Sequence, residues 1–227
     1  SLLFRKVLEA LSNALQKETE MTIQLINAGK RYNKDWIFHH LTYTFSAKKS
    51  YAIIGPNGSG KSTLLQVLSS AIQLNDGKSE WFINDNEIPD DKVYKHVALC
   101  APYLEPVEEM TLTEFLEFHQ SFKPFLKTIN SDTIISEIGL ETSKNKRINQ
   151  FSSGMKQRVK LAQCVFSDTA LVLLDEPCTN LDAAGIELYN RLIEQFCKNR
   201  TVVVSSNDKT EYSFCNNMLN IMDYKQR

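Results

Sequence analysis

The chain has no excess of charge of either sign. Its 26 lysines and arginines nearly balance its 27 aspartates and glutamates, which gives a formal net charge of −1. Proteins whose main ligand is DNA or RNA normally carry a basic patch and a high isoelectric point. We therefore expect no nucleic acid as the main ligand.

Long apolar runs are also missing. No run approaches the roughly 20 apolar residues that a membrane-spanning helix needs. The first twenty residues lack the small-residue cleavage site and the long apolar core of a secretory signal. Any membrane role is therefore expected to come through a partner protein.

Cysteine and histidine are few and poorly placed for metal binding. The five cysteines form an odd set without a CxxC pair, which favours buried, reduced thiols in the cytosol. His39 and His40 are adjacent, which is poor spacing for joint ligation, and His96 and His119 have no Cys or His partner nearby. We expect no structural metal.

The composition that is present fits one α/β domain, or a core with a smaller lobe. The 227 residues are 42% hydrophobic and 23% charged, enough to bury a real core. Residues 1–20 are predicted to form an amphipathic extension, with apolar side chains at helical spacing (Leu3, Val7, Leu8, Leu11, Ala14 and Leu15). It is either an upstream extension before Met21, which we favour, or a docking helix for another chain.

From residue 21 onward the pattern alternates between strands and helices. Residues 21–26 and 41–47 alternate apolar and polar positions, which predicts half-buried antiparallel strands. Residues 50–55 read as a buried central strand, and 78–85 and 96–101 as further strands.

The strand signal stops after residue 102 and resumes near residue 170. Residues 111–122 and 131–140 have helical patterns, with Thr113 as the expected cap of the first. A strand at 170–177, a helix near 183–198 and a strand at 201–206 follow. We interpret the intervening helices as a lobe inserted between strands.

The segment Gly55 to Thr63 reads GPNGSGKST and matches the phosphate-binding pattern G-x-x-x-x-G-K-[ST] between a buried strand and a helix. Glycines let backbone N–H groups turn around phosphate oxygens, and the helix start adds positive dipole. Lys61 would supply charge to the β- and γ-phosphates, Ser62 a hydroxyl to Mg²⁺, and Thr63 a contact near the α-phosphate. The predicted loop residues are Gly55, Pro56, Asn57, Gly58, Ser59, Gly60, Lys61, Ser62 and Thr63.

The buried strand LVLLDEP ends in two acids, Asp175 and Glu176. Buried acids are unfavourable unless cation or phosphate chemistry needs them. Asp175 would hold the Mg²⁺ shell, and Glu176 is placed to polarise an attacking water.

A third motif, FSSGMKQR at 151–158, opens a helix before this strand, and TNLD at 179–182 follows it. In this order the motifs resemble those of ABC-type ATPases over nearly all of 21–227. The resemblance implies an α/β P-loop NTPase core with an N-terminal antiparallel β region and an inserted helical subdomain at about 102–165. It implies the ATP-binding and ATP-hydrolysing subunit of an ABC transporter, with ATP and Mg²⁺.

The resemblance also implies a head-to-tail dimer in which ATP lies between one subunit's phosphate loop and the other's signature motif. Ser152, Ser153 and Gly154 would contact the partner's γ-phosphate, while Asn180 and Asp182 would lie where the two subunits communicate. The motif departs from the usual L-S-G-G-Q at its first, third and fifth positions (Phe151, Ser153 and Met155).

Two further positions follow from the resemblance. An aromatic ring is expected to stack on adenine, and Tyr32 stands at the matching position with Trp36 as a rival. The family's glutamine after the strand that enters the helical lobe is missing. Pro102 occupies its place, near Tyr103 and Glu105, so coupling uses another group or the shape of the loop.

The strand TVVVSS leads to Asn207, where the resemblance predicts a histidine that contacts the γ-phosphate. An amide can donate a hydrogen bond but cannot take up a proton. We expect the catalytic set Lys61, Glu176 and Asn207 to hydrolyse ATP more slowly than relatives with the histidine.

The expected partners are a second ATP-binding subunit and an integral membrane permease, with the chain peripheral on the cytoplasmic face of the membrane. One alternative is a nucleotide-gated regulatory subunit with weak hydrolysis. The other is a soluble ABC ATPase acting on ribosomes or DNA. That class generally carries tandem cassettes, coiled coils or basic arms, which this sequence lacks.

Overall fold

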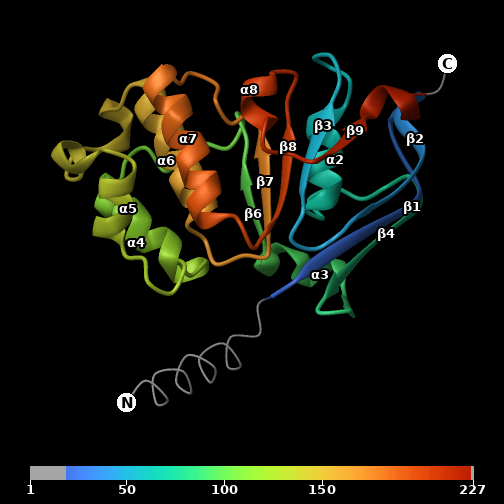
Figure 1. Ribbon diagram of the computed structural model, residues 1–227, viewed down its shortest axis with the longest axis horizontal. Helices are drawn as coiled ribbons and strands as arrows, with labels where there is room; N and C mark the ends of the chain where they lie inside the picture. Colours follow the sequence, from blue (N-terminus) through green and yellow to red (C-terminus); the bar gives the residue numbers. More distant parts are fainter. Residues whose placement is uncertain (1–18, 226–227) are drawn as a thin grey trace.

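The computed structural model describes residues 19–225, so the predicted amphipathic segment lies outside the described residues except for its last two. Two sheets lie side by side: an antiparallel sheet in the order β2-β1-β4-β5 and a parallel sheet in the order β6-β7-β8-β3-β9. Helices α4 to α7 lie at one end of the molecule and the antiparallel sheet at the other (Figure 1). No helix among the described residues is long and apolar enough to cross a membrane.

The antiparallel sheet consists of β1 (Met21–Tyr32), β2 (Asp35–Phe45), β4 (Asp76–Ile83) and β5 (Asn86–Ile88). Its burial alternates as the sequence predicts, with every second residue at the start of β1 inaccessible to solvent. β2 begins six residues before the predicted strand because its first half pairs with the end of β1 in a tight hairpin. β5 was not predicted, since its three residues carry no periodic signal.

The parallel sheet consists of β3 (Ser50–Ile54), β6 (Val97–Cys100), β7 (Leu171–Asp175), β8 (Thr201–Ser205) and β9 (Asn217–Asn220). The first four confirm predicted strands. β9 pairs only with β3, at the edge of the sheet, and its polar sequence NMLN hides it from an apolar pattern.

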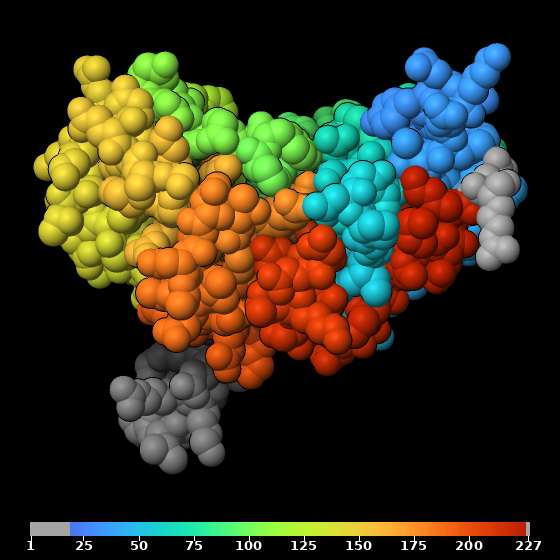
Figure 2. All heavy atoms as spheres, turned by 90° about the horizontal axis from the view of Figure 1, so that it is seen from above, coloured from blue at the N-terminus to red at the C-terminus, as the bar shows by residue number. Residues whose placement is uncertain are grey.

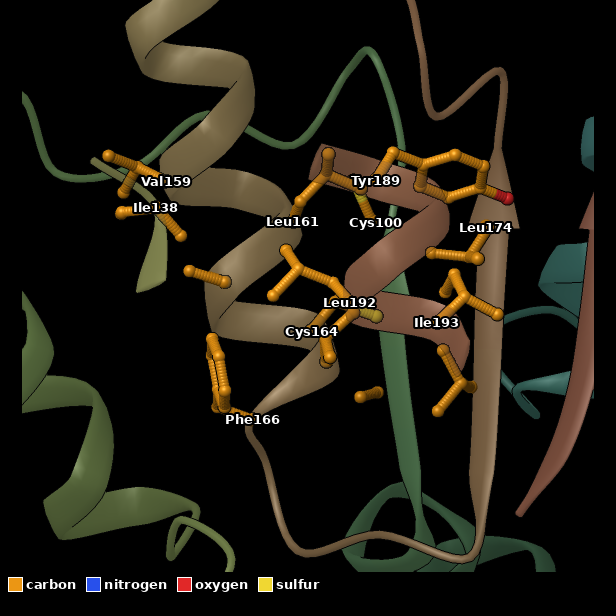
Figure 3. Close-up of a cluster of buried hydrophobic side chains, with 14 of the residues drawn as sticks. Cys100, Ile138, Val159, Leu161, Cys164, Phe166, Leu174, Tyr189, Leu192 and Ile193 are labelled. Atoms are coloured by element: carbon orange, nitrogen blue, oxygen red, sulfur yellow. The ribbon is translucent and has the colours of Figure 1, made fainter. Parts of the chain in front are cut away.

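The central parallel strands β7 and β8 are buried on both faces. Val172 and Leu174 pack into a core under the helices, the helix-side core, whereas Leu171 and Leu173 pack into a second core under the antiparallel sheet, the hairpin-side core. Figure 3 shows α6 and α7 turning their apolar side chains, Tyr189 among them, into the helix-side core. Two-sided burial explains why β7 and β8 read as continuous apolar runs rather than alternating ones.

All five cysteines are free and buried, as the sequence predicts. All five belong to the helix-side core, and the described part of the hairpin-side core contains none. Burial raises the pKa of the thiols, to about 12 for Cys100, Cys178 and Cys215.

The helices fill the connections between strands. The bounds are α2 (Lys61–Leu68), α3 (Asp90–Val93), α4 (Leu112–Phe122), α5 (Ser131–Glu137), α6 (Ser153–Val165), α7 (Ala183–Phe196) and α8 (Lys209–Tyr212). Seen from above, the helical end and the β3–α2 region occupy different parts of the surface (Figure 2).

The predicted cap of α4 is wrong. Thr111, not Thr113, is the N-cap, and it forms a capping box in which its hydroxyl accepts from Glu114 N and Glu114 accepts from Thr111 N. Thr113 lies inside the helix, and its hydroxyl donates to the carbonyl of Lys144 at 3.2 Å.

Candidate nucleotide-binding site

Three loops meet at the carboxyl edge of the parallel sheet. β8 pairs with β3 on one side and β7 on the other, and Ser205 stands opposite both Ile53 and Asp175. The loops that follow these strands therefore emerge together, where α/β sheets bind their ligands. They carry the predicted phosphate loop, the acid pair and Asn207.

The phosphate loop depends on two glycines. Gly58 has φ +74 and Gly60 has φ +104, a region that other residues rarely adopt. A Cβ on Gly60 would also lie 2.2 Å from Cγ2 of Ile37 in β2. The loop therefore packs directly under the antiparallel sheet, and Gly60 is required for that approach.

Lys61 begins α2 and points back into the loop. Its side chain is buried, and Nζ donates to the carbonyls of Gly55 at 2.9 Å and Pro56 at 3.3 Å. Ser62 is exposed on the first turn of the same helix, beside the N–H groups that a helix start leaves unpaired. A cation, free N–H groups and a hydroxyl thus surround the space that a phosphate would fill.

Three buried polar atoms have no hydrogen-bond partner among the described residues: Ser59 Oγ, Asp175 Oδ1 and Ser205 Oγ. Asp175 is only 3% exposed, so its unpaired carboxylate oxygen is unfavourable without a cation. Together with the Ser62 hydroxyl, Asp175 offers the hard oxygen ligands that suit Mg²⁺. No group of three His, Cys, Asp or Glu side chains lies close enough to hold a metal in the described part of the chain. The remaining ligands would be phosphate and water oxygens.

Glu176, one residue beyond Asp175, adopts the left-handed conformation with φ +44. Its backbone N–H donates to the carbonyl of Ser205 at 2.9 Å. Such a conformation in a residue other than glycine is unfavourable by about 1–3 kcal/mol and is often found at functional sites. The turn directs the chain sharply away from β7 directly after Asp175.

Asn207 lies beside the phosphate loop, because its Nδ2 donates to Oδ1 of Asn57 at 3.1 Å. The two side chains are 150 positions apart in the sequence and both are exposed. The structure therefore places Asn207 next to the predicted phosphate loop, and its contact with the γ-phosphate stays a prediction.

The signature segment forms a separate site at the start of α6. Ser152 caps the helix, accepting from Met155 N at 3.3 Å, and a Cβ on Gly154 would lie 3.1 Å from the Asn180 carbonyl. Asp182 caps α7 and lies 3.7 Å from Arg158. These segments line one hollow of about 530 Å³ whose lining includes Ser153 but no residue of the phosphate loop.

The two candidate adenine platforms lie at the β1–β2 hairpin. The Trp36 ring is already occupied, stacked on His39 at a centroid distance of 3.9 Å and lying 5.3 Å from the guanidinium of Arg31. Tyr32 is 49% exposed. The exposure favours Tyr32, and adenine stacking on it stays a prediction.

The loop after β6 places Tyr103 next to Pro102, the position at which the resemblance predicts a glutamine. Burial raises the pKa of Tyr103, a hydrogen bond with the Gln66 side chain of α2 lowers it, and the charge of Asp175 raises it further. Lys160 of α6 lies 3.5 Å from the Pro102 carbonyl and 3.4 Å from Glu105. Sequence reasoning did not single out Gln66, since nothing in its local pattern marks it.

The model of the ABC transporter family matches residues 38–179, more than half of the chain. The chain belongs to this family. The prediction of an ABC-type ATP-binding and ATP-hydrolysing transporter subunit is confirmed at the level of the family.

Individual ABC proteins match over most of the chain. ABC transporter A family member 11 of Dictyostelium discoideum is 30% identical over 186 residues, covering 78% of this chain and 22% of that protein. The chain thus spans about a fifth of that relative's length. The uncharacterized ABC transporter ATP-binding protein YybJ of Bacillus subtilis (strain 168) is 29% identical over 196 residues, 83% of this chain and 87% of that protein. The lantibiotic transport ATP-binding protein SrtF of Streptococcus pyogenes is 28% identical over 200 residues, which cover 83% of this chain and 81% of that protein.

Solved ABC cassettes have the same fold. A putative ABC transporter (ATP-binding protein) from Pyrococcus furiosus aligns with a TM-score of 0.74 at 23% identity, over 90% of this chain and 100% of that one. The ATP-binding cassette MJ0796, in a dimeric post-hydrolysis state bound to ADP and Pi, aligns with a TM-score of 0.77 at 22% identity. The alignment covers 90% of this chain and 97% of that one. The predicted α/β P-loop NTPase fold is confirmed.

Two buried side chains near the acid pair were missed by sequence reasoning. Gln157 and Glu211 both hydrogen-bond the loop that follows Glu176. Gln157 lies within the quoted signature segment, and Glu211 four residues after Asn207, but neither position shows its contact in the sequence.

Proposed function

We propose that the chain binds ATP with Mg²⁺ at the edge formed by β3, β7 and β8 and hydrolyses it within a head-to-tail dimer. The observation that carries the proposal is the unpaired buried carboxylate oxygen of Asp175 next to the phosphate loop. A carboxylate in that state is suited to a cation, and the adjacent loop is suited to the phosphates that accompany it.

The proposed roles follow the geometry. Lys61 and the α2 N-terminus would bind the β- and γ-phosphates, while Asp175 and Ser62 would hold Mg²⁺, which stabilises the charge that develops on the phosphate oxygens. Glu176 would orient the attacking water, and Asn207 would donate to the γ-phosphate in exchange for its contact with Asn57. The partner's Ser152, Ser153 and Gly154 would close the site, and Tyr32 would stack on adenine.

An integral membrane subunit is the proposed second partner. Large apolar side chains are exposed on the loop after β6 and on α4: Tyr103, Leu104, Val107, Phe118 and Phe122. Phe118 and Phe122 pack against each other with a centroid distance of 4.9 Å, and Phe122 is 74% exposed. Exposed apolar residues close together support a protein interface there. Such a partner would place the chain on the cytoplasmic face of a membrane.

A nucleotide-gated regulatory subunit with weak hydrolysis is the second candidate. It is favoured by the amide at position 207, which already donates to Asn57 and cannot exchange a proton with the reaction. ATP-dependent dimerisation without turnover would select this candidate over the enzyme.

Replacement of Glu176 by Gln separates the two functions. We expect steady ATP turnover by the unmodified protein to fall by about 100-fold or more in Glu176→Gln, because the water loses its base. ATP affinity and ATP-dependent dimerisation should persist. The measurement is phosphate release together with the oligomeric mass with and without ATP.

Glu187→Gln is the matched control, since Glu187 is exposed on α7. It should leave turnover unchanged. Unchanged turnover in Glu176→Gln would remove Glu176 from the chemistry. Purification with ribosomes rather than with a membrane protein would contradict the transporter role.

A further inference from the structure

One peptide group is held from two sides directly after Glu176. The carbonyl of Pro177 accepts from Gln157 Nε2 at 2.6 Å, and the N–H of Cys178 donates to Glu211 Oε1 at 2.7 Å. The carbonyl and the N–H belong to the same planar peptide bond, so the two contacts together fix its orientation. We call this arrangement the peptide clamp.

The two side chains of the peptide clamp come from functionally different segments. Gln157 lies on α6, three residues after Gly154 of the signature segment, and Glu211 lies on α8, four residues after Asn207. Both side chains are buried, with exposures of 4% and 6%. The peptide clamp therefore joins the signature helix, the loop after β7 and the loop after β8.

Glu211 is itself held in place. Tyr189 of α7, which Figure 3 shows among the buried side chains, donates its hydroxyl to the Glu211 carbonyl at 2.7 Å. Glu211 N donates to the Asp208 carbonyl at 3.1 Å. Burial raises the pKa of Glu211, hydrogen bonds from Ser206 and Cys178 oppose this, and the charges of Asp208 and Glu176 add to the rise.

The conformation of Glu176 needs such support. Its φ of +44 persists only where neighbouring groups fix the chain on both sides of it. On one side, the N–H of Glu176 donates to Ser205 of β8 at 2.9 Å. On the other side, the peptide clamp holds the Pro177–Cys178 peptide, which is the second peptide group after Glu176.

We propose that Glu211 is a positioning residue for ATP hydrolysis, whose carboxylate acts opposite Gln157 to fix the Pro177–Cys178 peptide and thereby orient Glu176. The inference rests on the proposed hydrolytic function. Glu211 is buried and contacts the loop after Glu176 through this peptide, so its proposed role is to set the geometry of Glu176. A displacement of about 1 Å at a reacting group can reduce a rate by up to about 100-fold.

Three variants of Glu211 test the peptide clamp. Glu211→Ala removes the acceptor, Glu211→Asp withdraws it by one methylene, and Glu211→Gln keeps a side-chain carbonyl for Cys178 N. We expect kcat to fall about tenfold or more in the Ala and Asp variants, with KM for ATP within about twofold. Gln should restore kcat to within about twofold of the unmodified protein. If Ala fails to fold, the Asp and Gln pair decides.

Thr169→Ala is the matched control, since it removes a buried side-chain hydrogen bond, from Arg200, at the opposite end of β7 from Glu176. We expect a lower melting temperature with kcat unchanged. The inference is overturned if kcat of the Ala or Asp variant stays within about twofold of the unmodified protein. It is also overturned if Gln is as slow as Ala while equally folded.

Amide hydrogen exchange separates this inference from the proposed function. The Cys178 amide should exchange slowly in the unmodified protein and in Glu211→Gln, and about tenfold or more faster in Glu211→Ala. Turnover with no effect of Glu211 overturns the positioning role alone. An unmodified protein without turnover overturns the proposed hydrolysis, and with it the positioning role, whereas the exchange rates still confirm or reject the physical contact.

Discussion

Asn207 shows how one side chain sets the chemistry available at a phosphate site. Its amide donates to Asn57 of the predicted phosphate loop, so the side chain lies where the proposed contact with the γ-phosphate needs it. An amide donates a hydrogen bond to an anion as an imidazole does, but it stays neutral between pH 5 and 8, where histidine changes charge. Binding of ATP and its hydrolysis should therefore depend on this residue to different degrees.

Two substitutions at position 207 measure that difference. Asn207→Ala should depress kcat more than ATP affinity, because its hydrogen bond serves the transition state more than the bound nucleotide. Asn207→His should raise kcat by about tenfold, less than the roughly 100-fold or more that a positioned acid–base group contributes. Initial rates and equilibrium nucleotide binding of both variants provide the measurement. Equal effects of Asn207→Ala on kcat and affinity, or none, would exclude Asn207 from the mechanism.

At the scale of elements, α4 contacts the end of α6 through a polar cluster. His119 of α4 makes hydrogen bonds to Ser167 Oγ at 2.8 Å and to Gln163 Nε2 at 3.2 Å, and its ring stacks near Phe125. Burial and, to a lesser extent, the neighbouring charge of Lys123 together lower the pKa of His119 to about 4. The contact between α4 and α6 therefore needs a neutral imidazole.

This contact predicts a pH dependence of stability with a definite sign. The folded state holds His119 neutral down to about pH 4, whereas the unfolded chain takes up the proton near pH 6.5. The contribution is present in full above pH 6.5 and is lost as pH falls towards 4. Between pH 7 and 4.5 the free energy of unfolding should fall by about 2 kcal/mol more in the unmodified protein than in His119→Gln, after allowance for partial exposure.

Urea unfolding of both proteins at the two pH values gives this double difference directly. Other titrating groups cancel in it, because they are common to the two proteins. The same pH dependence in both proteins would show that His119 is not held neutral by the fold.

An element can be predicted from the sequence when its own residues, or close neighbours in the chain, show why it forms. β7 and β8 were predictable because both of their faces are buried and their own residues record it. The cap of α4 was decided by Glu114, three positions after Thr111, and this capping-box pattern is local and could have been found in the sequence. At the candidate site, the phosphate loop and the acid pair are contiguous motifs and were found. The contact from Glu211 to Cys178 crosses 33 positions and has no sequence pattern.

At the scale of the molecule, the phosphate loop and the signature segment lie at two separate places, which the proposed dimer would use as half-sites. The hollow at the signature segment is lined by Ser152, Gly154 and the N-cap of α7, Asp182, among others, and by no residue of the phosphate loop. Each half has the unpaired N–H groups of a helix start. Two copies arranged head to tail would complete both sites at once, as cyclic two-fold symmetry requires.

Mixing two inactive variants tests this composite site. Lys61→Ala removes the lysine charge from the phosphate loop, and Gly154→Asp places a negative charge in the signature segment. Each homodimer carries its change in both copies and should be inactive. Random mixing makes about half of the dimers mixed, each with one intact site, so about a quarter of the original turnover should return. Phosphate release before and after mixing gives the result.

Lys61→Ala mixed with Glu176→Gln is the matched control. Both changes lie on the same half-site, so every composite site keeps a defect and no turnover should return. Recovery in this control, or none in the first mixture, would contradict the head-to-tail arrangement.

The location of the cysteines makes the rate of their alkylation a measure of local opening of the molecule. All five thiols lie in the helix-side core, and the described hairpin-side core has none. Alkylation of these buried thiols requires α6 and α7 to separate from the parallel sheet, or the neighbouring loops to move away. Separation of the antiparallel sheet alone would not expose them. The time course of alkylation would thus follow the opening of one face of the sheet, with no label introduced.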